Sequence, residues 1–137
     1  IQTNGSLLQQ KQILVKRLLP YISELRISFD AASKETYKNI RVNGSWEKLL
    51  DNTVWVRDVI KRSGFATQLT ADFVVQKDNY KEIPLFVKLC KELGIKKFNL
   101  QISGDYKVPN STICKSCATL AVWRTAMEMA GLNVDAA

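Results

Sequence analysis

Apolar positions along the chain follow two periods, and these periods alternate. Every third or fourth residue is apolar over residues 6–22, 45–64 and 83–93, which is typical of helices with one buried face. Residues 25–29, 66–76 and 95–102 are short runs rich in β-branched and aromatic residues, which predict buried strands. With a short strand at residues 1–4 and a short helix at 33–41, the predicted order is β-α-β-α-α-β-α-β.

Capping and stop signals set the expected ends of the helices. Ser33 and Ser45 are suitable N-caps, and Gly64 is placed to end the long helix. Asn79 and Glu82 have capping-box spacing. The residues expected to face the core are Leu7, Leu8, Leu14, Val15, Leu18, Leu19 and Ile22 in the first helix, Trp46, Leu49, Leu50, Thr53, Val56, Val59 and Ile60 in the long helix, and Ile83, Phe86, Val87, Cys90 and Leu93 in the helix after residue 82.

Strands that alternate with helices favour parallel pairing through right-handed crossovers. We therefore expect an α/β fold, a partial (β/α) barrel with about four parallel strands and flanking helices. A small open sheet is the alternative. Residues 1–104 form this unit. After residue 104 the pattern changes, and residues 105–137 predict a polar loop followed by a C-terminal helix at 112–132, which packs on or extends the barrel.

The size and net charge of the chain limit the kinds of domain, partner and location that are expected. The chain has 137 residues, enough for one domain with a core, and a formal net charge of +7. The excess of Lys and Arg favours anionic partners such as nucleic acid, or it is simply a solvated basic surface, since the positive residues are scattered. No apolar run approaches the roughly 20 residues of a membrane span, and no signal peptide is recognisable. A cytoplasmic protein is expected.

The residues that commonly carry catalysis or hold metals are few. The chain contains no histidine, which excludes His-based acid–base chemistry and His-ligated zinc sites in this sequence. Cys114 and Cys117 form a CxxC and are candidate metal or redox residues, although a zinc or iron–sulfur site needs about four ligands. Cys90 is expected in the core. No nucleophile–base pair is evident, so the catalytic residues are unknown.

Polar residues follow each predicted strand. Asn4 follows the first strand, Ser28 and Asp30 lie at the end of the second, and Gln76 ends the third. In parallel α/β sheets, ligands bind at the carboxyl ends of the strands. These residues therefore predict a site for a polar metabolite. Turns and helix caps require the same residue types, and spacing alone does not separate the two interpretations.

Five segments together resemble the radical S-adenosylmethionine (SAM) enzymes, in particular the branch with SPASM-type extensions. They are ISFDAASKETYKNIR, GSWEKLLDN, ADFVVQKDN, IPLFVKLCKELGI and KKFNLQI, and the similarity runs from about residue 1 to 102. The resemblance implies that TNG ends the third barrel strand. It implies that Ser28 and Asp30 lie beside the SAM ribose or amino-acid moiety, and that Arg41 reaches its methionine carboxylate.

The sequence lacks the motifs that carry the family's chemistry. The family's CxxxCxxC motif, which holds a [4Fe–4S] cluster, does not occur here, nor does the GGE segment. The first two βα units of the barrel are expected to be missing. No cofactor is expected in this chain, and SAM and [4Fe–4S] would be used only if a complementary chain supplied the motif.

Three functions remain open for such a chain. It is a fragment of a radical SAM enzyme completed by another chain, a half-barrel kept as a binding or scaffold module, or a basic module that binds nucleic acid or another anion. An incomplete barrel would expose unpaired strand edges and apolar faces. A homodimer, or pairing with a complementary chain, is therefore expected.

Overall fold

The structure, a computed structural model, describes residues 1–76 and 78–102. The predicted loop and helix at 105–137, with Cys114 and Cys117, lie outside the described residues. The elements are β1 (Gln2–Thr3), α1 (Gln12–Leu18), the 3₁₀ turn η1 (Leu19–Tyr21), β2 (Glu24–Ser28), α2 (Lys34–Ile40), α3 (Trp46–Ser63), β3 (Gln68–Val75), the 3₁₀ turn η2 (Tyr80–Glu82), α4 (Ile83–Glu92) and β4 (Lys97–Ile102).

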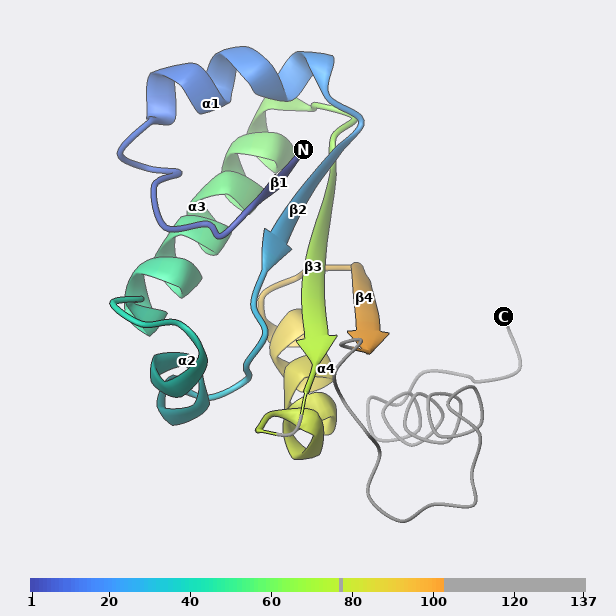
Figure 1. Ribbon diagram of the computed structural model, residues 1–137. Coiled ribbons are helices and arrows are strands. Elements are labelled where there is room, and N and C mark those ends of the chain that lie inside the picture. The colour runs from blue at the N-terminus through green and yellow to red at the C-terminus, as the bar shows by residue number, and fades with distance from the viewer. Residues whose placement is uncertain (77, 103–137) are drawn as a thin grey trace, which may run out of the picture.

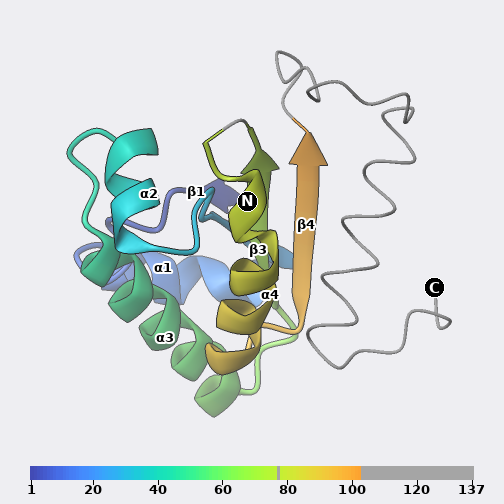
Figure 2. The same ribbon diagram turned by 90° about the horizontal axis from the view of Figure 1, so that it is seen from below.

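The four strands form one parallel sheet in the order β1-β2-β3-β4, so strands that follow one another in the chain are neighbours in space (Figure 1). The register pairs Gln2 with Arg26, Arg26 with Thr70, and Thr70 with Lys97. In Figure 2, α3 and α4 lie together on one side of this sheet. The predicted α/β fold is confirmed, and its strand order is that of consecutive units of a (β/α) barrel.

The core lies between the sheet and its helices. Alternate strand residues point into it, because successive side chains of a strand face opposite sides. Phe86 of α4 is fully buried and meets three rings, with centroid distances of 6.0 Å to Phe29, 4.7 Å to Phe73 and 5.9 Å to Phe98. This cluster joins α4 to the neighbouring strands. The predicted core position of Cys90 is confirmed, since its exposure is 1%.

Most capping predictions are confirmed. The Ser33 hydroxyl accepts a hydrogen bond from the N–H of Thr36, and that of Ser45 from the N–H of Lys48. Gly64 ends α3 with φ 67°, a left-handed conformation that glycine adopts without strain. These local signals fix where α2 and α3 begin and where α3 ends.

The prediction of a first helix from residue 6 is wrong. Residues 6–11 form turns, and α1 begins at Gln12. The Ser6 hydroxyl and backbone N–H both donate to the Asn4 side chain, at 2.8 and 3.0 Å, within this turn segment. Of the residues expected to face inward here, Leu8 and Leu19 are buried, but no residue of α1 itself is.

The predicted capping box before α4 is also wrong. Asn79 makes no side-chain cap, and η2 follows it instead. Its side-chain oxygen accepts from the N–H of Gln76 at 2.7 Å, and its amide donates to the carbonyls of Asp30 and Val74, each at 2.8 Å. Asn79 thus ties the ends of β2 and β3 together. Glu82 turns toward α2 rather than back to Asn79.

Candidate functional site

The sheet face opposite the core is polar. The register places side chains from all four strands on this face: Gln2, Glu24, Arg26, Ser28, Gln68, Thr70, Asp72, Val74, Lys97, Asn99 and Gln101. All but Val74 are polar or charged. A parallel sheet is ordinarily apolar on both faces because helices cover both. In the described structure, this polar face differs from the apolar faces usual in parallel sheets. It is therefore the candidate site.

Arg26 and Asp72 form the centre of the polar face. Arg26 donates from Nε to Asp72 Oδ2 at 2.9 Å and from Nη2 to Oδ1 at 3.0 Å, and Asn99 donates its amide to Oδ1 at 2.8 Å. Hydrogen bonding to Asp72 raises the pKa of Arg26 above its usual value. Asp72 is 4% exposed and its oxygens are occupied, so it holds Arg26 in place, while the Arg26 side chain stays 36% exposed.

A second charged group lies at the start of β2. Glu24 accepts from the Thr70 hydroxyl at 2.7 Å and from the Lys97 ammonium at 2.8 Å. The hydrogen bond from Lys97, with that from Thr70, lowers the pKa of Glu24 below its usual value. The four charges of the face, on Glu24, Arg26, Asp72 and Lys97, thus sum to zero and are paired across strands.

The carboxyl ends of β2 and β3 are joined through Asp30. Its φ is 54°, and its carboxylate accepts from the N–H of Val74 at 2.8 Å. The same carboxylate accepts a hydrogen bond from the Arg41 guanidinium in an ion pair. The structure therefore brings together two of the predicted site residues, Asp30 and Arg41. The partner of Arg41 here is this buried carboxylate, and the Arg41 side chain remains 35% exposed.

The other predicted site residues occupy different positions. Ser28 lies on the polar face, where its hydroxyl accepts from the Gln2 amide at 3.2 Å. Gln76 comes directly after β3, and its backbone N–H donates to the Asn79 side chain. Asn4 is exposed and closes the turn to Ser6. Ser28 is thus the predicted residue that belongs to the polar network.

Sequence reasoning missed the centre of the polar face. Glu24 and Arg26 alternate with Leu25 and Ile27 in β2, and a period of two is the signal for one buried and one exposed face. β4, KFNLQI, shows the same alternation. Asp72, inside the apolar segment LTADFVV, is the strongest single signal, because a carboxylate there needs a partner.

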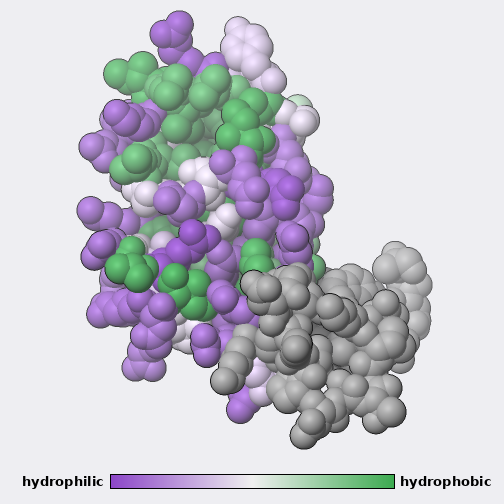
Figure 3. Space-filling view, in the orientation of Figure 1, coloured by the Kyte–Doolittle hydropathy of each residue, from purple (hydrophilic) through white to green (hydrophobic). Residues whose placement is uncertain are grey.

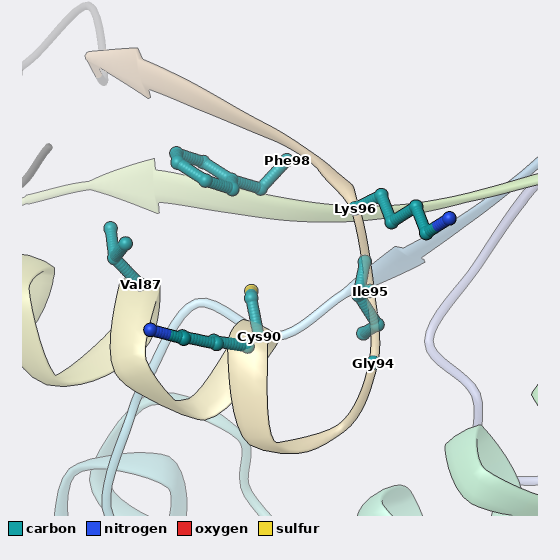
Figure 4. A pocket seen from close by; sticks show the side chains of 7 residues that line it. Val87, Cys90, Gly94, Ile95, Lys96 and Phe98 are labelled. Carbon is teal, nitrogen blue, oxygen red and sulfur yellow. The ribbon is translucent and has the colours of Figure 1, made fainter. Parts of the chain in front are cut away.

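A hollow lies on the helix side of the sheet, between α4 and β4. It has a volume of about 380 Å³, and Val87, Cys90, Ile95 and Phe98 line it, with Lys96 at its rim (Figure 4). Burial raises the pKa of the Cys90 thiol to about 12, so this sulfur stays protonated at neutral pH. The hollow is an apolar groove rather than a site for acid–base or metal chemistry.

Comparisons with family models and with curated proteins give no relative. No protein-family model matches the chain, and no curated protein matches it.

Within residues 1–76 and 78–102, no three His, Cys, Asp or Glu side chains are grouped so that they could hold a metal ion. No helix in this part of the chain is both long and apolar enough to cross a membrane.

Proposed function

We propose that this chain is a half-barrel binding module of the radical SAM type, which takes a polar metabolite with an amino-acid moiety, such as SAM. The polar sheet face carries the proposal. Its charges are fixed in pairs across β2, β3 and β4, so that a ligand would meet oriented donors and acceptors rather than freely moving side chains. The resemblance of residues 1–102 to the radical SAM enzymes is independent support.

Three side chains are suited to the parts of such a ligand. The Ser28 hydroxyl accepts from Gln2 and keeps its own proton for a ligand oxygen. Arg41 uses part of its guanidinium on Asp30, and its remaining N–H groups suit a carboxylate. The amide of Gln76, half-buried at the end of β3, can donate and accept.

The module is not proposed to cleave SAM with its own residues. A [4Fe–4S] cluster needs cysteine thiolates, and the cysteine in the described residues, Cys90, is a buried thiol with a pKa of about 12. Cys114 and Cys117 do not supply the three-cysteine motif of the family. The residues present therefore fit the polar ligand and do not fit the cluster.

Titration with SAM, followed by amide chemical shifts, tests this function. Shifts are expected at Ser28, Asp30 and Gln76. Ser28→Ala should weaken SAM binding about tenfold, because one hydrogen bond to a polar ligand is lost, whereas Ser63→Ala at the exposed end of α3 should not change it. Arg41→Lys keeps a cation beside Asp30 but removes the planar fork, and it should also weaken binding. No shift at millimolar SAM would overturn the proposal.

A basic module that binds nucleic acid is the second candidate, and the net charge of +7 favours it. Binding to a DNA duplex should then weaken steeply with salt, because released counterions drive it. Under this alternative, Ser28→Ala and Arg41→Lys leave DNA affinity unchanged, since neither change removes a positive charge.

A further inference from the structure

Asp30, two residues after the end of β2, has a backbone conformation that L-residues rarely adopt. Its φ is 54°, in the left-handed region, and such a residue persists only where its surroundings hold it. The N–H of Val74 donates to Asp30 Oδ1 at 2.8 Å, and the Asn79 amide donates to the Asp30 carbonyl at 2.8 Å. Backbone strain that is maintained in this way indicates a function for the side chain that it places.

The Asp30 carboxylate is engaged on both oxygens. Oδ1 accepts from Val74, and Oδ2 accepts from Nη2 of Arg41 in an ion pair. The Asp30 side chain is 8% exposed, so little of it is accessible to a ligand. The resemblance implies that Asp30 lies beside SAM, whereas this geometry favours an effect that Asp30 exerts through Arg41.

Arg41 is fixed at its backbone as well as at Nη2. Its N–H donates to the Tyr37 carbonyl at 2.8 Å at the end of α2, and its carbonyl accepts from the N–H of Gly44 at 2.9 Å. The Arg41 side chain nevertheless stays 35% exposed. The exposed residues of α2 are all polar, and the surface over this helix in Figure 3 is mainly hydrophilic. Arg41 is thus anchored by the protein and still accessible to a polar ligand.

The ion pair leaves one edge of the Arg41 guanidinium complete. A guanidinium has two edges that can bind a carboxylate through two N–H groups, Nε with Nη2 and Nη1 with Nη2. Nη2 carries one hydrogen on each edge. Whichever of these two hydrogens Asp30 accepts, the other edge keeps both of its N–H groups. Among residues 1–76 and 78–102, none accepts a hydrogen bond from Nε or Nη1 of Arg41.

We propose that Asp30 is a positioning residue, which holds Arg41 so that this complete edge receives the carboxylate of the ligand. The inference rests on the proposed function, since the ligand is the polar metabolite with an amino-acid moiety. Asp30 lies where the carboxyl ends of β2 and β3 meet, which is where parallel sheets bind ligands. Its contribution is orientation: the long Arg41 side chain gives up its rotamer freedom before the ligand arrives, so binding costs less entropy.

Calorimetric titration of the full chain with two ligands tests the positioning role. The ligands are SAM and decarboxylated SAM, in which a hydrogen replaces the carboxylate. The wild type should bind SAM about 30-fold more tightly, because the decarboxylated ligand cannot accept from Arg41. Asp30→Asn should weaken SAM binding about tenfold and change the binding of decarboxylated SAM less than about twofold. A merely structural role of Asp30 would weaken both ligands equally.

Asp30→Asn is suited to this test because asparagine also tolerates the left-handed region. Its side-chain oxygen can still accept from Val74, but its NH2 group cannot accept from Arg41. Asp58→Asn is the matched control, since it removes the carboxylate of another ion pair, with Arg57 in α3, and should change neither dissociation constant. In an Arg41→Ala background, Asp30→Asn should not weaken SAM binding further, because the residue through which it acts is gone.

A measurement on the wild type needs no variant to fold. ¹⁵N relaxation of the arginine Nε–H groups in the ligand-free protein should show Arg41 restricted and Arg17, at the exposed end of α1, freely mobile. Equal mobility of these two side chains would overturn the inference. So would unchanged or tighter SAM binding by Asp30→Asn, or equal losses for the two ligands. Absence of SAM binding by the wild type would instead overturn the proposed function, and this inference with it.

Discussion

The carboxylate of Glu82, the last residue before α4, accepts a hydrogen bond from the Ser33 hydroxyl at 2.5 Å. It also accepts from the Thr36 hydroxyl and from the N–H of Ala32, each at 2.7 Å. A negative charge therefore sits at the N-terminus of α2, where the helix presents unpaired N–H groups. Two helices that are distant in the sequence are fixed to each other at the carboxyl end of the sheet.

Glu82→Gln should lower the free energy of unfolding by about 1–3 kcal/mol at pH 7, since it removes the negative charge and replaces one acceptor oxygen by an NH2 that cannot accept from Ser33, Thr36 or Ala32. Burial would raise the pKa of Glu82, but the hydrogen bonds from Ser33, Ala32 and Thr36 outweigh it and the pKa is lowered. A carboxyl with a lowered folded-state pKa stabilises the fold above its unfolded-state pKa. This stabilisation disappears as the pH falls through the folded-state pKa.

Urea unfolding at pH 7 and at several values between about pH 5 and 3 measures this contribution. The wild-type protein should lose more stability over that range than Glu82→Gln. Glu92→Gln, at the exposed C-terminal end of α4, should change stability by no more than about 0.5 kcal/mol. Parallel pH profiles for the wild type and Glu82→Gln would contradict the role of this carboxylate.

Asn79→Ala should be among the most destabilising polar substitutions in the described structure. The side chain is 1% exposed and makes three hydrogen bonds to backbone groups: the carbonyl of Asp30 after β2, the carbonyl of Val74 in β3, and the N–H of Gln76 after β3. Truncation leaves buried backbone groups unpaired, for an expected loss of about 2–4 kcal/mol. Asn4→Ala, which removes an exposed turn contact, should cost less than about 1 kcal/mol. Similar losses for both variants in chemical denaturation would be the contrary result.

The fold could be predicted from the sequence because its signals are local and repeated. Ser33, Ser45 and Gly64 act within one turn of a helix end, and the packing period of α4 extends over several turns. The alternation of helices and strands then leaves parallel pairing as the simple topology. Each of these inferences needs only neighbouring residues.

The contacts of the candidate site could not be predicted, because they join residues far apart in the chain. Asn79 and Glu82 have the spacing of a capping box, yet their side chains bond instead to tertiary partners, the Asp30 carbonyl after β2 and the Ser33 hydroxyl at the start of α2. Arg26 and Asp72 are brought opposite each other by the register of β2 and β3. Local propensity gives no register, so their pairing appears only in the folded sheet.

The first helix shows a different limit. Its apolar period correctly indicates an amphipathic segment, but the period does not say whether the face is covered within the same chain. Leu14 and Leu18 are exposed although the pattern predicts them inside.

Gly5 is the position where the turn after β1 requires glycine. Its φ is 74°, and a Cβ there would lie 2.9 Å from Leu49 Cδ1 and 3.1 Å from Ile27 Cγ2. The Asn52 amide also donates to its carbonyl at 2.7 Å, so the backbone has little room to shift. Gly5→Ala should therefore cost roughly 2–4 kcal/mol, from left-handed strain and from overpacking against α3 and β2.

Gly64→Ala separates these two causes. Gly64 has a similar φ of 67°, but no atom lies within 4 Å of the position that its Cβ would take. This substitution should cost about 1 kcal/mol, the strain alone. Thermal and urea unfolding of both variants measures the difference, which reports the close approach of the first turn to Leu49. If Gly5→Ala were no more destabilising than Gly64→Ala, the turn would not be packed against α3 as described.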